Sequence, residues 1–232
     1  MVEHTVRSFD TDLEALDRHI SEMGGIAEKM LADAMDSLAG RNVDLALRVI
    51  ATDPRLDALQ RMTEEDAVRT LARRQPVAVD LRDIVGVIRI AADLERIGDQ
   101  AKNIAKRAAK IANESRVPRA VIGLKSMHEV AATQLKDVLD AFVQRDAERA
   151  KGVWEQDLEL DALEDSVFRD LLTFMMEDPR NITFCTHLLF CSKNLERVGD
   201  HATNIAETVY YVVTGESLPA DRPRGLDSSV LP

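Results

Sequence analysis

Hydrophobic residues recur along this chain at alternating intervals of three and four, the spacing of one face of an amphipathic α-helix. The pattern persists over six stretches, which short segments containing Pro, Gly or polar residues separate. It predicts helices at residues 6–38, 44–74, 79–113, 119–144 and 146–177, and a sixth from the turn at 178–179 to about residue 213. The chain is therefore expected to be all-α.

The third and sixth stretches carry one motif twice. Residues 93–105 read D-L-E-R-I-G-D-Q-A-K-N-I-A, and residues 194–206 read N-L-E-R-V-G-D-H-A-T-N-I-A, at an offset of 101 (196 − 95). Each half of the chain has the order long helix, acid-bearing helix, Pro turn, motif helix. Short connections make consecutive helices antiparallel neighbours, so we predict two tandem three-helix bundles related by an internal repeat. We place them at residues 1–114 and 115–214, with a disordered tail at 215–232.

Each motif holds two carboxylates four residues apart, Glu95 with Asp99 and Glu196 with Asp200. Four residues are about one helical turn, so each pair lies on one face, which the heptad pattern places away from the apolar seam. A single pair of this kind is usually a solvated surface, but its repetition favours a shared role. Gly98 and Gly199 lie in the middle of these helices, where Gly is unfavourable. They indicate either a ligand close to the backbone or a tight helix crossing.

The middle helix of each half adds a second acidic pair, Asp53 with Asp57 and Asp157 with Asp161. Adjacent antiparallel helices would bring both pairs of one bundle together, and four converging carboxylates require a cation. Oxygen ligands suit iron, manganese, magnesium, calcium or zinc. Asp53 and Asp157 have an alternative role as helix N-caps, Asp53 with Pro54 at the first position of a restarted helix.

Composition narrows the functional classes. The chain is 45% hydrophobic but 4% aromatic, as helical bundles are, and its net charge of −11 argues against a nucleic-acid partner. No apolar run is long enough for a membrane span, and the polar N-terminus does not resemble a signal peptide. Cys185 and Cys191 are expected to be buried, reduced thiols of a cytosolic protein. No nucleophile–base, zinc-protease or phosphate-loop motif is present, so we predict that the chain is not an enzyme.

The doubled L-E-R-[IV]-G-D-x-A-x-N-I-A motif, the Q-P-V-A-V-D-L-R segment at 75–82 and the D-P-R-N-I turn at 178–182 resemble the PhoU family of phosphate-uptake regulators. The resemblance covers residues 5 to 214 and implies two three-helix bundles. It also implies multinuclear iron or zinc clusters on the bundle surface, with manganese or magnesium as alternatives. The implied ligands are Asp53, Asp57, Glu95 and Asp99 in one half and Asp157, Asp161, Glu196 and Asp200 in the other.

The resemblance further implies a cytoplasmic adaptor, often a homodimer, that bridges the ATPase subunit of the phosphate ABC transporter and a PhoR-type sensor histidine kinase. Such an adaptor restrains phosphate uptake and keeps the phosphate-starvation response off when phosphate is plentiful. Two alternatives rest on the acidic residues alone. One is a carboxylate-bridged metalloenzyme acting on phosphoesters, and the other is a metal-free helical scaffold.

Overall fold

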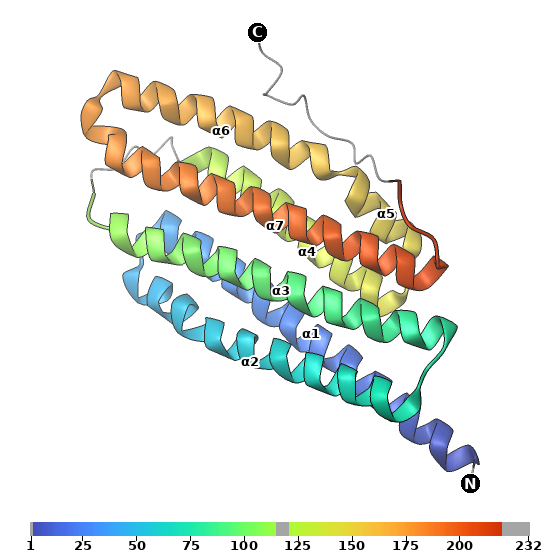
Figure 1. Cartoon of the computed structure of the whole chain (residues 1–232). Helices are drawn as coiled ribbons and strands as arrows, with labels where there is room; N and C mark the ends of the chain where they lie inside the picture. Colours follow the sequence, from blue (N-terminus) through green and yellow to red (C-terminus); the bar gives the residue numbers. More distant parts are fainter. Residues whose placement is uncertain (1, 115–120, 220–232) are drawn as a thin grey trace.

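Every regular element of the described chain is helical. The structure is a computed structural model that describes residues 2–114 and 121–219, apart from the side chains of residues 2–8 and 157. Its elements are α1 (Val2–Gly40), α2 (Val43–Arg74), α3 (Ala78–Ile111), α4 (Ile122–Gln144), α5 (Ala147–Glu155), α6 (Asp157–Glu177), the 3-10 helix η2 (Pro179–Asn181) and α7 (Ile182–Thr214) (Figure 1). The predicted all-α class is confirmed.

The helices form two bundles that pack side by side. Helices α1, α2 and α3 contact one another, as do α4, α6 and α7, and the halves meet along α3 with α7 and α1 with α4. Figure 1 shows α2, α3, α7 and α6 in that order across one layer, with α1 and α4 behind them. Equivalent helices thus make equivalent contacts in the two halves, which confirms two tandem three-helix bundles built from an internal repeat.

The fifth predicted helix is interrupted at Gln156, so its two parts, α5 and α6, together match α2 of the first half. Helix α5 begins after Asp146, whose side chain accepts a hydrogen bond from the Arg149 amide at 3.0 Å. The break is held in place because the buried Gln134 of α4 donates its side-chain amide to the Gln156 carbonyl at 3.2 Å. Trp154 anchors the end of α5, since its buried indole donates to Glu207 at 3.3 Å.

The predicted restart of a helix at Asp53 is wrong. Helix α2 runs without a break through Pro54, and its N-cap is Asn42, whose side chain accepts a hydrogen bond from the Leu45 amide at 2.9 Å. Asp53 is instead a buried residue in the middle of the helix. Packing against α1 and α3 keeps the helix continuous although Pro54 cannot donate a backbone hydrogen bond. In the other half, α6 begins at Asp157 itself and its N-cap is Gln156.

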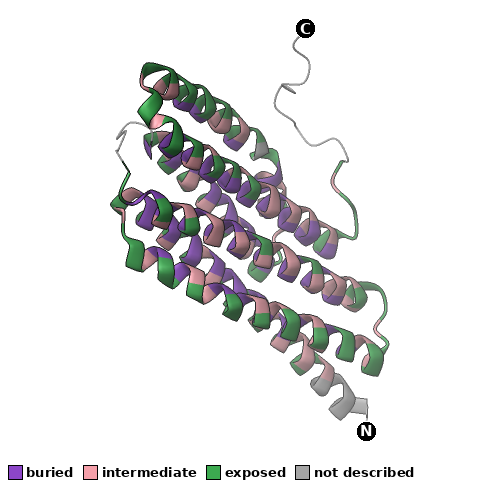
Figure 2. Cartoon of the chain, turned by 60° about the vertical axis from the view of Figure 1, so that its left-hand side comes forward, coloured by how far each residue is buried: buried purple, intermediate pink, exposed green. Residues whose placement is uncertain are grey.

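The predicted apolar seams form the core (Figure 2). Buried residues face inward on every helix of the two layers, whereas exposed residues cover the outside. All eight seam residues of each motif helix are buried. They are Val87, Ile90, Leu94, Ile97, Ala101, Ile104, Ala108 and Ile111 of α3, and Leu188, Cys191, Leu195, Val198, Ala202, Ile205, Val209 and Val212 of α7.

Gly98 and Gly199 mark a tight helix crossing, which decides between the two explanations that the sequence left open. A Cβ atom at Gly98 would lie 2.3 Å from Cδ2 of Leu56, and one at Gly199 would lie 2.4 Å from Cδ2 of Leu160. Both leucines are fully buried. Each therefore fits into the notch that a glycine leaves, and the contact holds α2 against α3 and α6 against α7 in the same way.

Both cysteines are buried, as the sequence predicted. Cys185 and Cys191 are buried free thiols, and burial raises the pKa of Cys191 to about 12.

Gly215, in the left-handed region at φ 78°, ends α7. Residues 220–232 of the predicted tail lie outside the described residues. Within the described part of the chain, no helix combines the length and apolar character that a membrane crossing requires.

Candidate functional site: two acidic clusters

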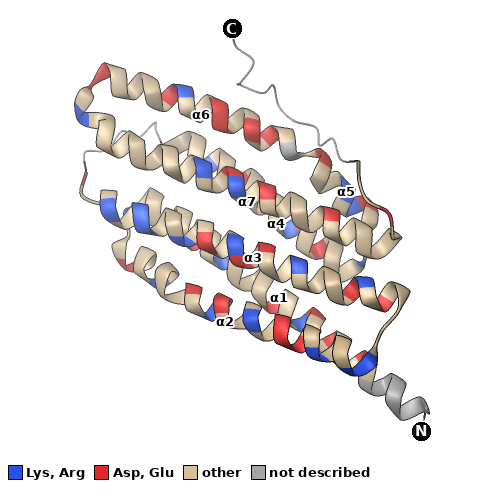
Figure 3. Cartoon of the chain, viewed as in Figure 1, with Lys and Arg blue, Asp and Glu red and all other residues tan. Residues whose placement is uncertain are grey.

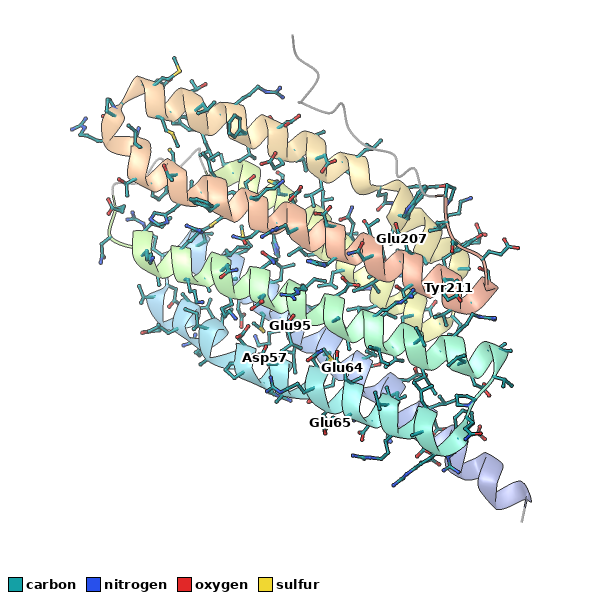
Figure 4. All side chains as sticks on the ribbon, viewed as in Figure 1. Asp57, Glu64, Glu65, Glu95, Glu207 and Tyr211 are labelled. Carbon is teal, nitrogen blue, oxygen red and sulfur yellow. The ribbon has the colours of Figure 1, made fainter. Side chains whose placement is uncertain are left out.

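The first acidic cluster consists of Asp53, Asp57, Glu95 and Asp99, where α2 and α3 pack against each other. Figure 3 shows acidic segments in the middle of both helices, and Figure 4 shows Asp57 and Glu95 on the same side of the molecule. These carboxylates are buried or half-buried, because the tight crossing at Gly98 draws the two helices together beside them. The heptad pattern predicted that these carboxylates face solvent. Packing between α2 and α3 shields them from water more than that prediction implies.

Lys102 lies inside this cluster. Its Nζ donates to Asp53 Oδ2 at 2.7 Å and to Asp99 Oδ1 at 2.5 Å, so it joins α3 to α2. The lysine side chain is 19% exposed and that of Asp53 is 9% exposed. Burial alone would lower the pKa of Lys102, but the hydrogen bonds to Asp53 and Asp99 outweigh burial and raise its pKa far above the ordinary value. The ammonium is therefore charged throughout the physiological range.

Glu95 is a half-buried carboxylate of the first cluster with a raised pKa. Burial raises its pKa, and the nearby charges of Asp99, Asp57 and Asp53 raise it further. Arg96 opposes this shift, with its Nε 3.6 Å from Oε2 of Glu95. That guanidinium is mostly exposed, so its contribution is weak. The first cluster thus retains negative charge around Glu95 in spite of Lys102.

The second acidic cluster lies at the matching contact between α6 and α7 and consists of Asp161, Glu164, Glu196 and Asp200. Burial raises the pKa of Glu164, and the charges of Glu196, Asp165 and Asp161 add to the shift while Lys193 opposes it. Glu196 accepts a hydrogen bond on Oε1 from Lys193 at 2.7 Å. Its other oxygen, Oε2, is buried without a hydrogen-bond partner. The side chain of Asp157, the remaining predicted ligand, lies outside the described residues.

Sequence reasoning missed Lys102 and Glu164, although the repeat contains a signal for both. At the motif offset of 101, Lys102 corresponds to Thr203. At the offset of 104 that relates Asp57 to Asp161, Glu164 corresponds to Gln60. The first cluster has the cation Lys102 where the second has Thr203, and the second has the carboxylate Glu164 where the first has Gln60. The cation that contacts Glu196 in the second cluster, Lys193, comes from a different position of the repeat. The two clusters are therefore chemically unequal.

The described carboxylates of the two clusters do not gather tightly around one point. Among the side chains that the structure describes, no three from Asp, Glu, His and Cys gather closely enough to hold one. In the first cluster, Lys102 lies between two of the predicted ligands. In the second cluster, the unpartnered Glu196 Oε2 is an acceptor that a bound cation would satisfy. Metal ligation by the eight carboxylates stays a prediction.

His201 belongs to the contact between the bundles. Its Nδ1 lies 2.9 Å from Oδ1 of Asp93, and Asn204 donates to the same oxygen at 3.3 Å. The internal repeat relates His201 to Gln100 and Asp93 to Asn194, and both of these are buried. The two motif copies thus differ at positions that meet across the interface between α3 and α7. Asn204 therefore bonds the neighbouring bundle.

Comparisons with known proteins find relatives that match nearly the whole chain. The family model described as "PhoU domain" matches twice, at residues 20–108 and 124–209. The chain is 53% identical over 229 residues to a phosphate-specific transport system accessory protein PhoU homolog of Rhizobium meliloti (strain 1021), covering 98% of this chain and 96% of the relative. A homolog with the same description from Caulobacter vibrioides (strain NA1000 / CB15N) is 48% identical over 224 residues, covering 97% of both.

Solved structures show the same architecture. The crystal structure of PhoU from Pseudomonas aeruginosa superposes with a TM-score of 0.87 at 38% identity, covering 90% of this chain and all (100%) of that one. The phosphate transport system regulatory protein PhoU from Streptococcus pneumoniae gives a TM-score of 0.83 at 26% identity, covering 91% of this chain and 99% of that one. The likeness therefore extends over both bundles.

Proposed function

Because this chain belongs to the PhoU family, we propose that it is a cytoplasmic regulator of phosphate homeostasis that restrains phosphate uptake. One observation carries the proposal: a relative described as an accessory protein of the phosphate-specific transport system matches 98% of the chain. The resemblance of the doubled motif points to negative regulation when phosphate is plentiful. An accessory role of this kind requires docking surfaces more than a catalytic centre.

The proposed partners are the ATPase subunit of the phosphate ABC transporter and a PhoR-type sensor histidine kinase. The description of the relatives as accessory proteins supports contact with the transporter, and the family resemblance supplies the kinase. The same resemblance underlies the proposal that the chain is a homodimer. The net charge of −11 suits protein partners with basic surfaces and disfavours nucleic acid.

Metal ions, as iron or zinc clusters with manganese or magnesium as alternatives, are the proposed cofactors. The predicted ligands lie on two helices in each half, so a bound cation would neutralise the carboxylates and tie those helices together. This is a structural or regulatory role, and we propose no catalysis. The alternative of a metalloenzyme acting on phosphoesters has less support, because Lys102 separates two of the carboxylates that a bridged metal pair would require.

Binding to the transporter tests the proposal biochemically. The purified chain is expected to form a complex with the purified ATPase subunit of the phosphate transporter, measured by size-exclusion chromatography with light scattering. The ATPase subunit of an unrelated ABC importer serves as the control and is expected to elute alone. Failure to bind the phosphate transporter subunit, in metal-containing and metal-free buffer alike, would contradict the role as a transport adaptor.

A further inference from the structure

The first acidic cluster already contains a cation. Lys102 Nζ makes two hydrogen bonds to carboxylate oxygens, one on each of the two helices that carry the cluster. It therefore joins the same helices that a bridging metal would join. The contact partners are Asp53, the most buried of the four carboxylates, and Asp99 of the repeated motif.

A tethered ammonium competes well with a metal ion for this position. Lys102 is part of α3, so its binding carries no loss of translational freedom, whereas a free ion loses that freedom on binding. An ion that entered would have to displace an ammonium that is only 19% exposed and then leave it without its two partners. A metal ion also needs several oxygens around it, and two of the four carboxylates already point oxygens at Nζ.

The second cluster has a different balance of charge. Thr203 replaces the lysine at the equivalent position, and Glu164 adds a carboxylate where the first repeat has Gln60. Lys193 donates to Glu196 of this cluster at 2.7 Å, and the lysine side chain is 57% exposed whereas that of Glu196 is 16% exposed. The two clusters therefore present different surroundings to an incoming ion.

We infer that Lys102 is the resident cation of the first acidic cluster and excludes a metal ion from it. This inference deepens the proposed metal role, on which it rests, and it assigns a specificity-determining residue to it. The two halves of the repeat then differ: a lysine links the two helices of the first cluster, and Thr203 stands at the equivalent position of the second.

Metal content per chain tests the inference. Wild type, Lys102→Thr and the first-cluster variant Asp57→Asn/Glu95→Gln are incubated with Mn²⁺ or Zn²⁺, desalted and measured by elemental analysis. Lys102→Thr copies the residue of the second repeat and is expected to bind more metal per chain than wild type. Asp57→Asn/Glu95→Gln is expected to match wild type, because no metal occupies the first cluster. Circular dichroism confirms that each variant is folded.

Two results would overturn the inference. One is a loss of metal in Asp57→Asn/Glu95→Gln, which would place an ion in the first cluster of the wild type. The other is a Lys102→Thr protein that binds no more metal than wild type, which would mean that the lysine is not what keeps ions out. If Lys102→Thr does not fold, the first-cluster variant still decides the question. Neither result would contradict the proposed role in phosphate transport. That role is tested separately, by binding to the ATPase subunit and by phosphate uptake.

Discussion

Leu56→Ala is expected to lower the free energy of unfolding by about 2–5 kcal/mol, the usual loss for truncating a buried leucine. Leu56 is fully buried and fits into the notch at Gly98, so its removal leaves a cavity where α2 crosses α3. Gly98→Ala in the wild-type background is expected to destabilise by about 1–3 kcal/mol, because the new methyl group would lie 2.3 Å from Leu56 Cδ2. Chemical denaturation measures both values.

The double variant Leu56→Ala/Gly98→Ala tests the contact itself. With the leucine truncated, Gly98→Ala should no longer destabilise and should gain up to about 1 kcal/mol from the better helix propensity of Ala. Gly25→Ala is the matched control, since Gly25 is an exposed glycine within α1 and a Cβ there would meet nothing within 4 Å. Equal effects of Gly98→Ala in both backgrounds would show that the crossing is not set by this pair.

Lys102→Met should destabilise the metal-free protein by about 2–4 kcal/mol at pH 7, somewhat less than the loss for a fully buried broken ion pair. The substitution keeps the apolar stem but leaves Asp53 buried without its partner. The loss should shrink as the pH falls from 7 toward 4.5. Burial and neighbouring carboxylates raise the pKa of Glu95, so protonation in this window removes a negative charge from the folded cluster.

Lys151→Met is the control for this prediction. Lys151 also pairs with a carboxylate, that of Glu155 at 3.7 Å, but the two side chains are 44% and 56% exposed, and such pairs contribute about 0–1 kcal/mol. Urea denaturation with a chelator present, repeated between pH 4.5 and 7, separates the two lysines. Similar small losses for both would show that Lys102 does not neutralise a buried charge.

Hydrophobic periodicity was sufficient to predict most of this fold. The seams of α3 and α7 follow from spacing alone, because a helix that buries one face must repeat apolar residues along it. The break at Gln156 could not be predicted in this way. It depends on a hydrogen bond from Gln134, which is distant in sequence. At Pro54 the sequence predicted an interruption that the structure does not have. Tertiary packing keeps α2 continuous there and overrides the local preference of Pro.

The candidate site was predictable in its carboxylates but not in their partners. The doubled motif identified Glu95, Asp99, Glu196 and Asp200 because a repeat exposes matching positions. The bond from Lys102 to Asp53 depends on how α2 and α3 cross, and a single sequence does not show that geometry. The most informative positions were those at which the two copies differ, Lys102 against Thr203 and Gln60 against Glu164.

Phosphate uptake in living cells tests the regulatory role most directly. In a strain that lacks the gene for this chain, radiolabelled phosphate is supplied after a period of phosphate-replete growth, and its initial rate of entry is measured. We predict that uptake stays high in the deletion strain and falls to the parental rate when the wild-type gene is restored. Normal shut-off of uptake in the deletion strain would contradict the proposal that this protein restrains the phosphate transporter.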